Sequence, residues 1–188
     1  MADFESNIDA VILDIEKKVL KNFGHVGMQT VLNDVTSGIL RTMKRRIHRD
    51  GVNSMGTKIG GGNYSTKPAY FNPDQGSVML SLANKGKTGR TKFKNGDAHK
   101  TRYYSRGYKE FRTANKKITN KVNLEFKGDL RRALTFKKSR YNHFVIGMST
   151  LSAIEKSDNL EQKYGGQIWG IGAMENKIID ETLKYYTK

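Results

Sequence analysis

The chain contains no cysteine, only two prolines and no long run of apolar residues. Without thiols it forms neither a disulfide nor a thiolate metal site. Its apolar stretches are only a few residues long, and a membrane helix needs about 20, so we exclude a membrane span. Near its start the chain carries Asp3, Glu5 and Asp9, which is unlike a signal or transit peptide. We therefore expect a soluble protein made in a cytosol.

Clustered catalytic side chains are also missing. Catalysis and metal binding need groups that converge, and such groups often recur at short spacings. The histidines occur singly, and the carboxylates form no cluster of the DxD type. We interpret His48 as a structural or surface residue rather than a metal ligand. The GKT triplet at Gly86 lacks the GxxxxGK[ST] spacing of a phosphate loop. We therefore expect no enzyme activity, no cofactor and no metal.

Positive charge dominates the middle of the chain. The sequence holds 34 basic and 18 acidic residues, a net charge of +16. Residues 41–142 hold 26 of the basic and 6 of the acidic residues, whereas residues 143–188 have a net charge of −1. Such an excess favours a polyanionic partner: DNA, RNA or an acidic protein surface.

A length of 188 residues suits one domain. We expect residues 1–188 to form a single α+β domain with three segments. Residues 1–50 are a helical pair, residues 51–105 an extended arm or loop insertion, and residues 106–188 a sheet with C-terminal helices.

Apolar periodicity predicts both N-terminal helices. Apolar residues recur at three- and four-residue steps over residues 3–20 and again over residues 28–47, as on one face of an amphipathic helix. Gly51 is placed to cap the second helix. The last turns of this helix carry Arg41, Lys44, Arg45, Arg46 and Arg49. These cations form either a solvated face that complements the helix dipole or a contact with nucleic acid or an acidic partner.

The segment from residue 51 to about 102 shows little periodicity. Glycines interrupt it, both prolines lie in it, and only residues 77–82 suit a short strand or helical turn. A long structureless connection inside a domain indicates disorder or an arm that becomes ordered on a partner. We favour the arm because the segment contains the apolar anchors Tyr64, Tyr70, Phe71 and Phe93.

The expected sheet is small and antiparallel, with about three to five strands. Apolar residues alternate over residues 122–126, which predicts a half-buried central strand. Residues 141–148 are β-branched and aromatic and suit a second strand. One or two others are expected from residues 77–82 and 133–137. The segment that begins at Leu130 is either a short helix or a helix that turns into a strand. The two N-terminal helices would cover the apolar face of this sheet.

The last third of the sequence predicts two helices. Ser149 or Thr150 can cap a helix that runs to about Tyr164, and a final helix follows over residues 172–186. Residues 167–171 read as a short extended segment between them. Trp169 is either a core residue or an anchor between subunits.

Basic and aromatic residues interleave between Lys85 and Arg112. This mixture can neutralise phosphates and stack on bases, and an arm that faces protein or solvent would have the same composition. Direct DNA contact, contact with acidic surfaces of neighbouring proteins, and no specific partner all stay open. The residues expected to contact another subunit or partner are Tyr64, Tyr70, Phe71, Phe93, Tyr103, Tyr104, Tyr108, Phe111, Arg112 and Trp169. The cations expected to contact DNA or an acidic surface are Lys85, Lys87, Arg90, Lys92, Lys94, Lys100, Arg102 and Arg106.

Three segments, in order, also carry a family resemblance: GYKEFR at 107–112, VNLEFKGDL at 122–130 and EQKYGGQIWGIGAMENKIIDE at 161–181. Over about residues 100–183, and weakly at RRIHRDG (residues 45–51), the chain resembles small bacteriophage virion proteins of the neck (head–tail connector) and tail-completion type. The resemblance implies a homo-oligomeric ring, about six or twelve copies, in the virion. Its partners would be portal, connector or tail proteins, with contact to packaged DNA left open, and assembly would take place in the host cytoplasm. In those proteins the segment around IWGI looks like a strand that returns to the sheet.

The alternative is a nucleic-acid-binding protein that acts as a monomer or dimer through residues 85–112. An enzyme such as a nuclease ranks third, because no catalytic pattern supports it.

Overall fold

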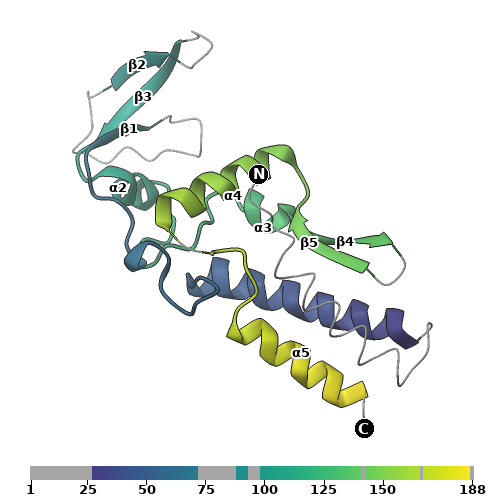
Figure 1. Cartoon of the computed structure of the whole chain (residues 1–188). Helices are drawn as coiled ribbons and strands as arrows, with labels where there is room; N and C mark the ends of the chain where they lie inside the picture. The colour runs from purple at the N-terminus through teal and green to yellow at the C-terminus, as the bar shows by residue number, and fades with distance from the viewer. Residues whose placement is uncertain (1–26, 72–87, 93–97, 141–142, 166, 187–188) are drawn as a thin grey trace. The chain divides into compact units, whose positions relative to one another are not determined.

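The computed structural model describes residues 27–71, 88–92, 98–140, 143–165 and 167–186. These form an α+β chain (Figure 1), which confirms the predicted class. The chain divides into two compact units, unit 1 (residues 1–59 and 123–188) and unit 2 (residues 60–122). These boundaries differ from the expected ones at residues 51 and 105. The helix expected over residues 3–20 and the strand expected over residues 77–82 lie outside the described residues.

A long helix forms the centre of unit 1. It is α-helical over residues 27–44 and continues as a π-helix, η1 (Arg45–Asp50). It ends at Gly51, whose φ is 71° and whose N–H is bonded to the Arg46 carbonyl, so the predicted helix and its cap are confirmed. The apolar stripe is buried throughout: Met28, Val31, Leu32, Val35, Ile39, Met43 and Ile47.

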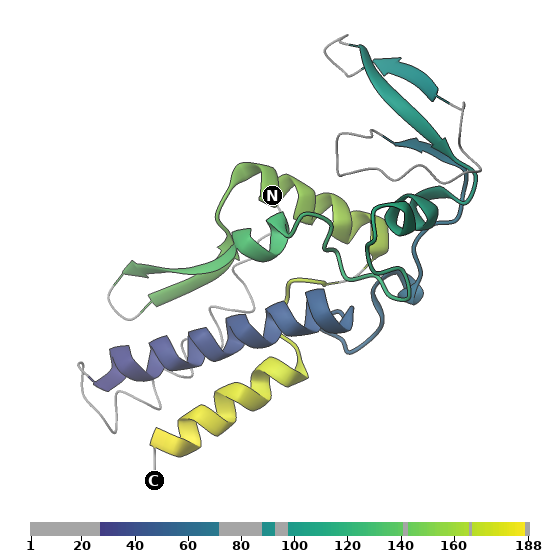
Figure 2. The same ribbon diagram turned by 180° about the vertical axis from the view of Figure 1, so that it is seen from behind.

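The C-terminal helix, α5 (Ala173–Tyr186), packs along the long helix, and the view from behind shows the same pairing (Figure 2). The two helices approach closely at Gly38, where an added Cβ would lie 2.7 Å from Cγ2 of Ile178. Ile179 and Leu183 are buried, as predicted. Met174 was expected on the same face, but it is 53% exposed. The final helix is therefore confirmed, with a narrower buried stripe than expected.

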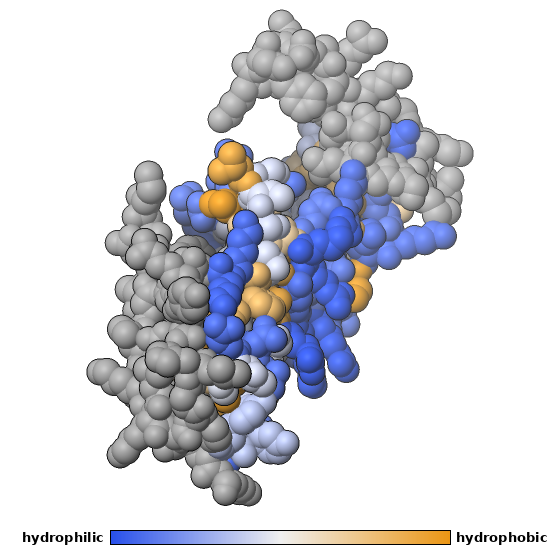
Figure 3. Space-filling model, turned by 90° about the vertical axis from the view of Figure 1, so that its right-hand side faces the viewer, coloured by the Kyte–Doolittle hydropathy of each residue, from blue (hydrophilic) through white to orange (hydrophobic). Residues whose placement is uncertain are grey.

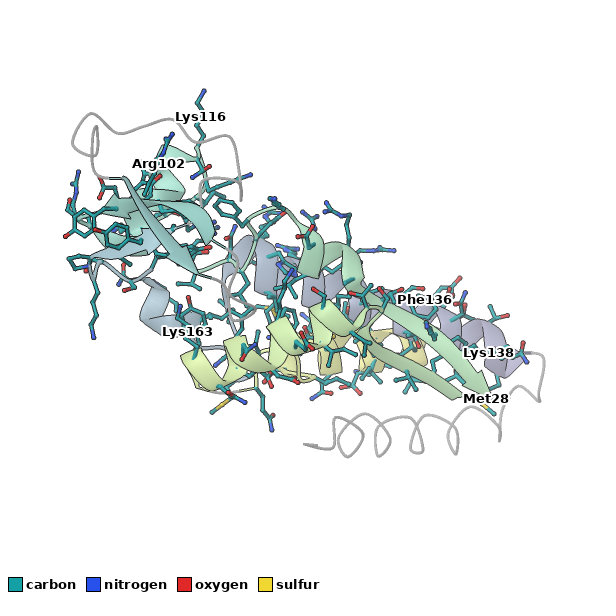
Figure 4. The ribbon with its side chains drawn as sticks, turned by 90° about the horizontal axis from the view of Figure 1, so that it is seen from above. Met28, Arg102, Lys116, Phe136, Lys138 and Lys163 are labelled. Carbon is teal, nitrogen blue, oxygen red and sulfur yellow. The ribbon has the colours of Figure 1, made fainter. Side chains whose placement is uncertain are left out.

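Unit 1 also contains a β-hairpin. Helix α3 (Asp129–Ala133) leads directly into β4 (Leu134–Arg140), which pairs antiparallel with β5 (His143–Met148). Phe136 lies opposite Ile146, and Figure 4 labels Phe136 and Lys138 on this strand. The predicted helix-to-strand junction is confirmed, and so is the strand expected at residues 141–148 over its described part, residues 143–148. In the described part of unit 1 the sheet has only these two strands.

The predicted central strand at residues 122–126 is wrong. These residues have no regular secondary structure, and Leu124 has a positive φ of 49°. The side chain of Asn123 competes for the backbone, since its Oδ1 accepts a hydrogen bond from the Glu125 N–H (3.3 Å). The boundary between the two units falls in this segment, after Val122. Consequently β5 pairs with β4 rather than with this segment.

Helix α4 (Leu151–Tyr164) has the expected caps. Oγ1 of Thr150 accepts a hydrogen bond from the Ala153 N–H, and Gly165 ends the helix with a φ of 61°. The strand expected at residues 167–171 is wrong, because these residues form bends. Their N–H groups bond to a side chain instead of a sheet: Oε1 of Glu161 accepts from Ile168 (2.7 Å) and Trp169 (3.2 Å).

A buried ion pair connects the long helix to α5. Nε of Arg46 lies 2.8 Å from Oε1 of Glu175, and the two side chains are 2% and 0% exposed. The remaining guanidinium nitrogens donate to the carbonyls of Val52 (3.2 Å), Ile168 (3.2 Å) and Gly170 (2.8 Å). Both interpretations of the basic helix end, as a solvated face or a partner contact, are therefore wrong for Arg46, whereas Arg41, Arg45 and Arg49 are exposed.

Unit 2 contains a second antiparallel sheet. Its order is β1 (Ala69–Phe71), β3 (Ala98–Tyr104), β2 (Thr88–Lys92), and α2 (Gly107–Ala114) packs against it. A short 3-10 helix, η2 (Ile59–Gly62), lies at the unit boundary. In the described ranges the extended arm is therefore wrong, since these strands pair with each other. Gly107 (φ 59°) permits a crossing of the chain, because a Cβ there would lie 2.1 Å from the Lys67 carbonyl oxygen. None of the helices in the described ranges has the length and apolarity to cross a bilayer.

Replacement of Arg46 by alanine should destabilise the protein by about 3–5 kcal/mol, because Glu175 and three carbonyls would stay buried without their partner. Urea unfolding measures the loss. The matched control is Arg45→Ala, whose side chain is 67% exposed and whose loss should stay within about 0.5 kcal/mol. Equal losses of unfolding free energy in the two variants would contradict this stabilising role of Arg46.

Candidate functional site

The side of the unit 2 sheet that faces α2 is an aromatic core. Tyr104 and Phe111 are 1% and 0% exposed, with ring centroids 5.4 Å apart and edge-to-face. Phe71 and Tyr108 stack on Phe111 at 5.0 Å and 5.7 Å. These separations are favourable for aromatic pairs. Four of the residues expected to contact a partner thus stabilise unit 2 itself.

Arg112 adds a cation to this core. Its guanidinium carbon lies 4.2 Å from the ring centroid of Tyr64, and both residues are buried. Nε of Arg112 donates to the Ile118 carbonyl at 2.9 Å. A desolvated cation over a ring contributes about 2 kcal/mol. A partner contact for Tyr64 and Arg112 stays a prediction, while their role inside unit 2 follows from this geometry.

Two polar groups on β3 lack hydrogen-bond partners within the described part of the chain. They are Nη1 of Arg102 and the hydroxyl of Tyr104, both shielded from solvent. Burial raises the pKa of Tyr104, and the positive charge of Arg102 acts in the opposite direction. The phenol is therefore neutral at pH 7.

One side of the sheet carries a row of basic positions. In the register, Arg90 lies opposite Lys100, and Thr88 lies opposite Arg102. Since alternate residues of a strand share a side, positions 90, 92, 100 and 102 lie on the same side, here called the basic side, which is also the side of Phe71 and Tyr104 (Figure 4 labels Arg102). Such a row can neutralise phosphates or carboxylates.

The opposite side of the sheet carries two tyrosines that lie next to each other. Tyr70 lies opposite Tyr103, with ring centroids 5.2 Å apart, and Tyr70 is 54% exposed. We call this pair the tyrosine face. The positions that share its side on β2 and β3 are Gly89, Thr91, His99 and Thr101. By register, the basic positions and the Tyr70–Tyr103 pair therefore lie on opposite sides of the sheet.

The other predicted site residues lie in different places. Trp169 is 2% exposed in the core of unit 1, with its ring centroid 6.0 Å from that of His48. Arg106 is exposed just before α2, and its N–H donates to Oε2 of Glu110 (2.9 Å). Phe93, Lys85, Lys87 and Lys94 lie outside the described residues.

Sequence reasoning missed a second basic group, in unit 1. Burial and the nearby Arg131 lower the pKa of Lys44. Burial also lowers the pKa of His48, although the Asn123 carbonyl and Glu125 oppose this shift. Lys44 and Arg131 are far apart in the sequence, so only the fold brings their charges together. Among the described residues, no three His, Asp or Glu side chains lie where they could hold a metal ion.

Removal of the Tyr104 hydroxyl should leave the unfolding free energy unchanged or raise it by about 1 kcal/mol, because a buried group without a partner is lost. Truncation of the whole ring in Tyr104→Ala should instead cost about 3–5 kcal/mol. Urea unfolding of Tyr104→Phe and Tyr104→Ala tests both. A clear loss in Tyr104→Phe would show that the hydroxyl has a partner.

The lowered pKa of His48 predicts acid sensitivity. The unfolded state takes up this proton first as the pH falls, so the stabilisation is complete above about pH 6.5 and decreases below it. The slope should reach at most about 1.4 kcal/mol per pH unit. Unfolding free energies of the wild type and His48→Gln, measured from about pH 8 to about pH 5, give this slope as their difference. Parallel pH profiles would contradict the prediction.

Comparison with known proteins identifies no relative. Neither a protein-family model, nor a curated protein, nor a solved structure matches the chain. The assignment of a function therefore depends on the residues and on their geometry.

Proposed function

We propose that the chain is a structural subunit of a bacteriophage virion. It forms an oligomeric ring in the neck, head–tail connector or tail-completion apparatus and joins portal-side and tail-side proteins around the DNA channel. The family resemblance described above supports this function. Within unit 1, Arg46 in RRIHRDG is bonded to Ile168, Gly170 and Glu175 in the C-terminal segment, so two segments that carry the resemblance are physically joined.

The observation that carries the proposal is the exposure of large apolar side chains on both units. Leu151 is 80% exposed, Tyr185 77%, Tyr70 54% and Met174 53%. In one side view the described surface is largely hydrophilic (blue), with separate apolar groups (orange) at the surface (Figure 3). Large apolar groups that stay exposed are typical of chains that bury them against neighbours. A ring subunit has two such neighbours.

A second candidate is nucleic-acid binding by unit 2. The basic side, at positions 90, 92, 100 and 102, is the observation that favours it. Binding through about four phosphate contacts would give a salt dependence with a slope of about −4 in log K against log salt.

The purified chain should assemble into rings. Light scattering should give a mass that is a multiple of the 21.3 kDa chain, and negative-stain electron microscopy should show annular particles. A chain that stays monomeric over a wide concentration range would contradict the ring. Such a monomer with steeply salt-dependent DNA affinity would establish the second candidate instead.

A further inference from the structure

Three arginines form a row along one side of the long helix of unit 1. Arg41, Arg45 and Arg49 follow one another at four-residue steps and are all exposed. The buried stripe, which includes Met43 and Ile47, lies on the opposite side of the helix. Cations of like sign at this spacing destabilise a helix. The arginine row therefore does not stabilise the helix on which it lies.

The helix dipole explains only part of the arginine row. Cations stabilise the C-terminal end of a helix, but this effect falls off within the last turn. Arg49 lies in that turn, whereas Arg41 lies more than two turns before the helix ends at Asp50.

The nearby carboxylate also holds the arginine row only loosely. Oδ2 of Asp50 lies 3.7 Å from Nε of Arg45, and Oδ1 lies 4.0 Å from Nε of Arg49. The two arginine side chains are 67% and 74% exposed, and such long pairs between exposed groups contribute little. The arginines can therefore exchange Asp50 for another anion.

The fold brings a further cation to this end of the helix. Nδ1 of His48 lies 3.2 Å from the Asn123 carbonyl oxygen, so the segment that leads into α3 lies beside the last turns of the long helix. Burial and the nearby Arg131 of α3 lower the pKa of Lys44, so these two cations are close enough to repel each other. An anion bound between them would relieve this repulsion.

Together these side chains form one positively charged surface. We call Arg41, Lys44, Arg45, Arg49 and Arg131 the unit 1 basic surface. The carboxylates that pair with it among the described residues are Asp50 and Glu125, so the group has a net charge of +3. Arg41 and Lys44 form no ion pair with a carboxylate in the described ranges.

The unit 1 basic surface offers no apolar anchor. None of the large apolar side chains that are exposed in the described chain lies within residues 41–50 or 123–132, and Leu124 and Phe126 are half-buried. A contact with an acidic protein would bury apolar or aromatic anchors at its centre. A single-stranded nucleic acid would need exposed rings on which its bases stack. The backbone of a duplex needs only groups that neutralise or bind its phosphates.

We propose that the unit 1 basic surface binds the phosphate backbone of double-stranded DNA. This inference goes beyond the proposed ring, in which contact with DNA stayed open, and it does not require the ring. It also differs from the second candidate function, which places the nucleic acid on unit 2. From Arg41 to Arg49 the row extends about 12 Å along the helix axis. The same length of duplex carries about seven phosphates, which is enough for each arginine to contact one.

Two triple variants with the same change in charge test this contact. Variant A is Arg41→Gln with Arg45→Gln and Arg49→Gln. Variant B replaces three exposed lysines of α4 and α5 by glutamine: Lys156, Lys177 and Lys184. The affinity of the full-length chain for a short DNA duplex of mixed sequence is measured at several salt concentrations.

Variant A should bind the duplex about tenfold or more weakly than the wild type. Its slope of log K against log salt should be shallower by about 2.7, since each lost phosphate contact removes about 0.9. Variant B should change the affinity by less than about threefold, because charges away from the contact are screened by salt. The wild type should bind the duplex more tightly than a single strand of the same length.

Further measurements separate binding from folding and assembly. The melting temperature of variant A should equal or slightly exceed that of the wild type, because like-charged neighbours are removed. Rings, where the wild type forms them, should persist in variant A. Variant C changes the basic side of unit 2, as Arg90→Gln with Lys92→Gln and Lys100→Gln, and should keep duplex affinity within about threefold of the wild type.

Several results would overturn the proposal. Equal losses of affinity in variants A and B would show that net charge alone attracts DNA. A loss in variant C but not in variant A would place the nucleic acid on unit 2. A variant A that keeps its DNA affinity but loses rings would make this surface a contact between proteins. Tighter binding of the single strand would contradict a duplex partner. A wild type that forms no ring removes the proposed function, while the affinities still decide this inference.

Discussion

The buried pair of Arg46 and Glu175 organises unit 1. A cation and an anion out of contact with water are tolerated only when almost every polar atom has a partner, and here the guanidinium also binds three backbone carbonyls. The second carboxylate oxygen accepts from the Gly172 N–H at 2.9 Å. The ion pair therefore holds together the segments that follow η1 and α4. Because Glu175 lies in the first turn of α5, the pair also fixes where α5 begins to pack along the long helix.

In unit 2 the packing of aromatic rings has the corresponding role. Rings from β1, β3 and α2 pack around Phe111, and the guanidinium of Arg112 lies over Tyr64. Once one side of the sheet is used in this way, the two-residue period of β3 sends Tyr103 to the other side, where it meets Tyr70. The Tyr70–Tyr103 pair on this side is thus a consequence of the core on the other side.

Local signals in the sequence predicted several elements well. The apolar stripe of the long helix, its Gly51 cap, the Thr150 cap of α4 and the junction from α3 into β4 are all present. Each of these depends on residues within a few positions of one another. The failures lie at residues 122–126 and 167–171 and in the supposed arm, where side chains or other strands of the same chain bind the backbone groups.

The candidate site, too, could be predicted only in part from the sequence. Its composition, basic and aromatic, is visible in the sequence, and the residue types alone indicate a polyanion or an acidic protein surface as partner. The placement of the basic positions and of the Tyr70–Tyr103 pair on opposite sides of one sheet is not visible, because it depends on the register of β1, β2 and β3.

The sequence by itself determined the class of the fold, the long helix, α4 and α5 with their approximate ends, and the net charge, since helix periodicity, caps and net charge are local or additive properties. Only the tertiary structure decided that Arg46 is buried rather than solvated, that residues 60–122 form their own unit, and which aromatic residues face outward. The physical reason is that burial depends on which distant segments of the chain pack together, and residues that are neighbours in the sequence carry little information about that packing.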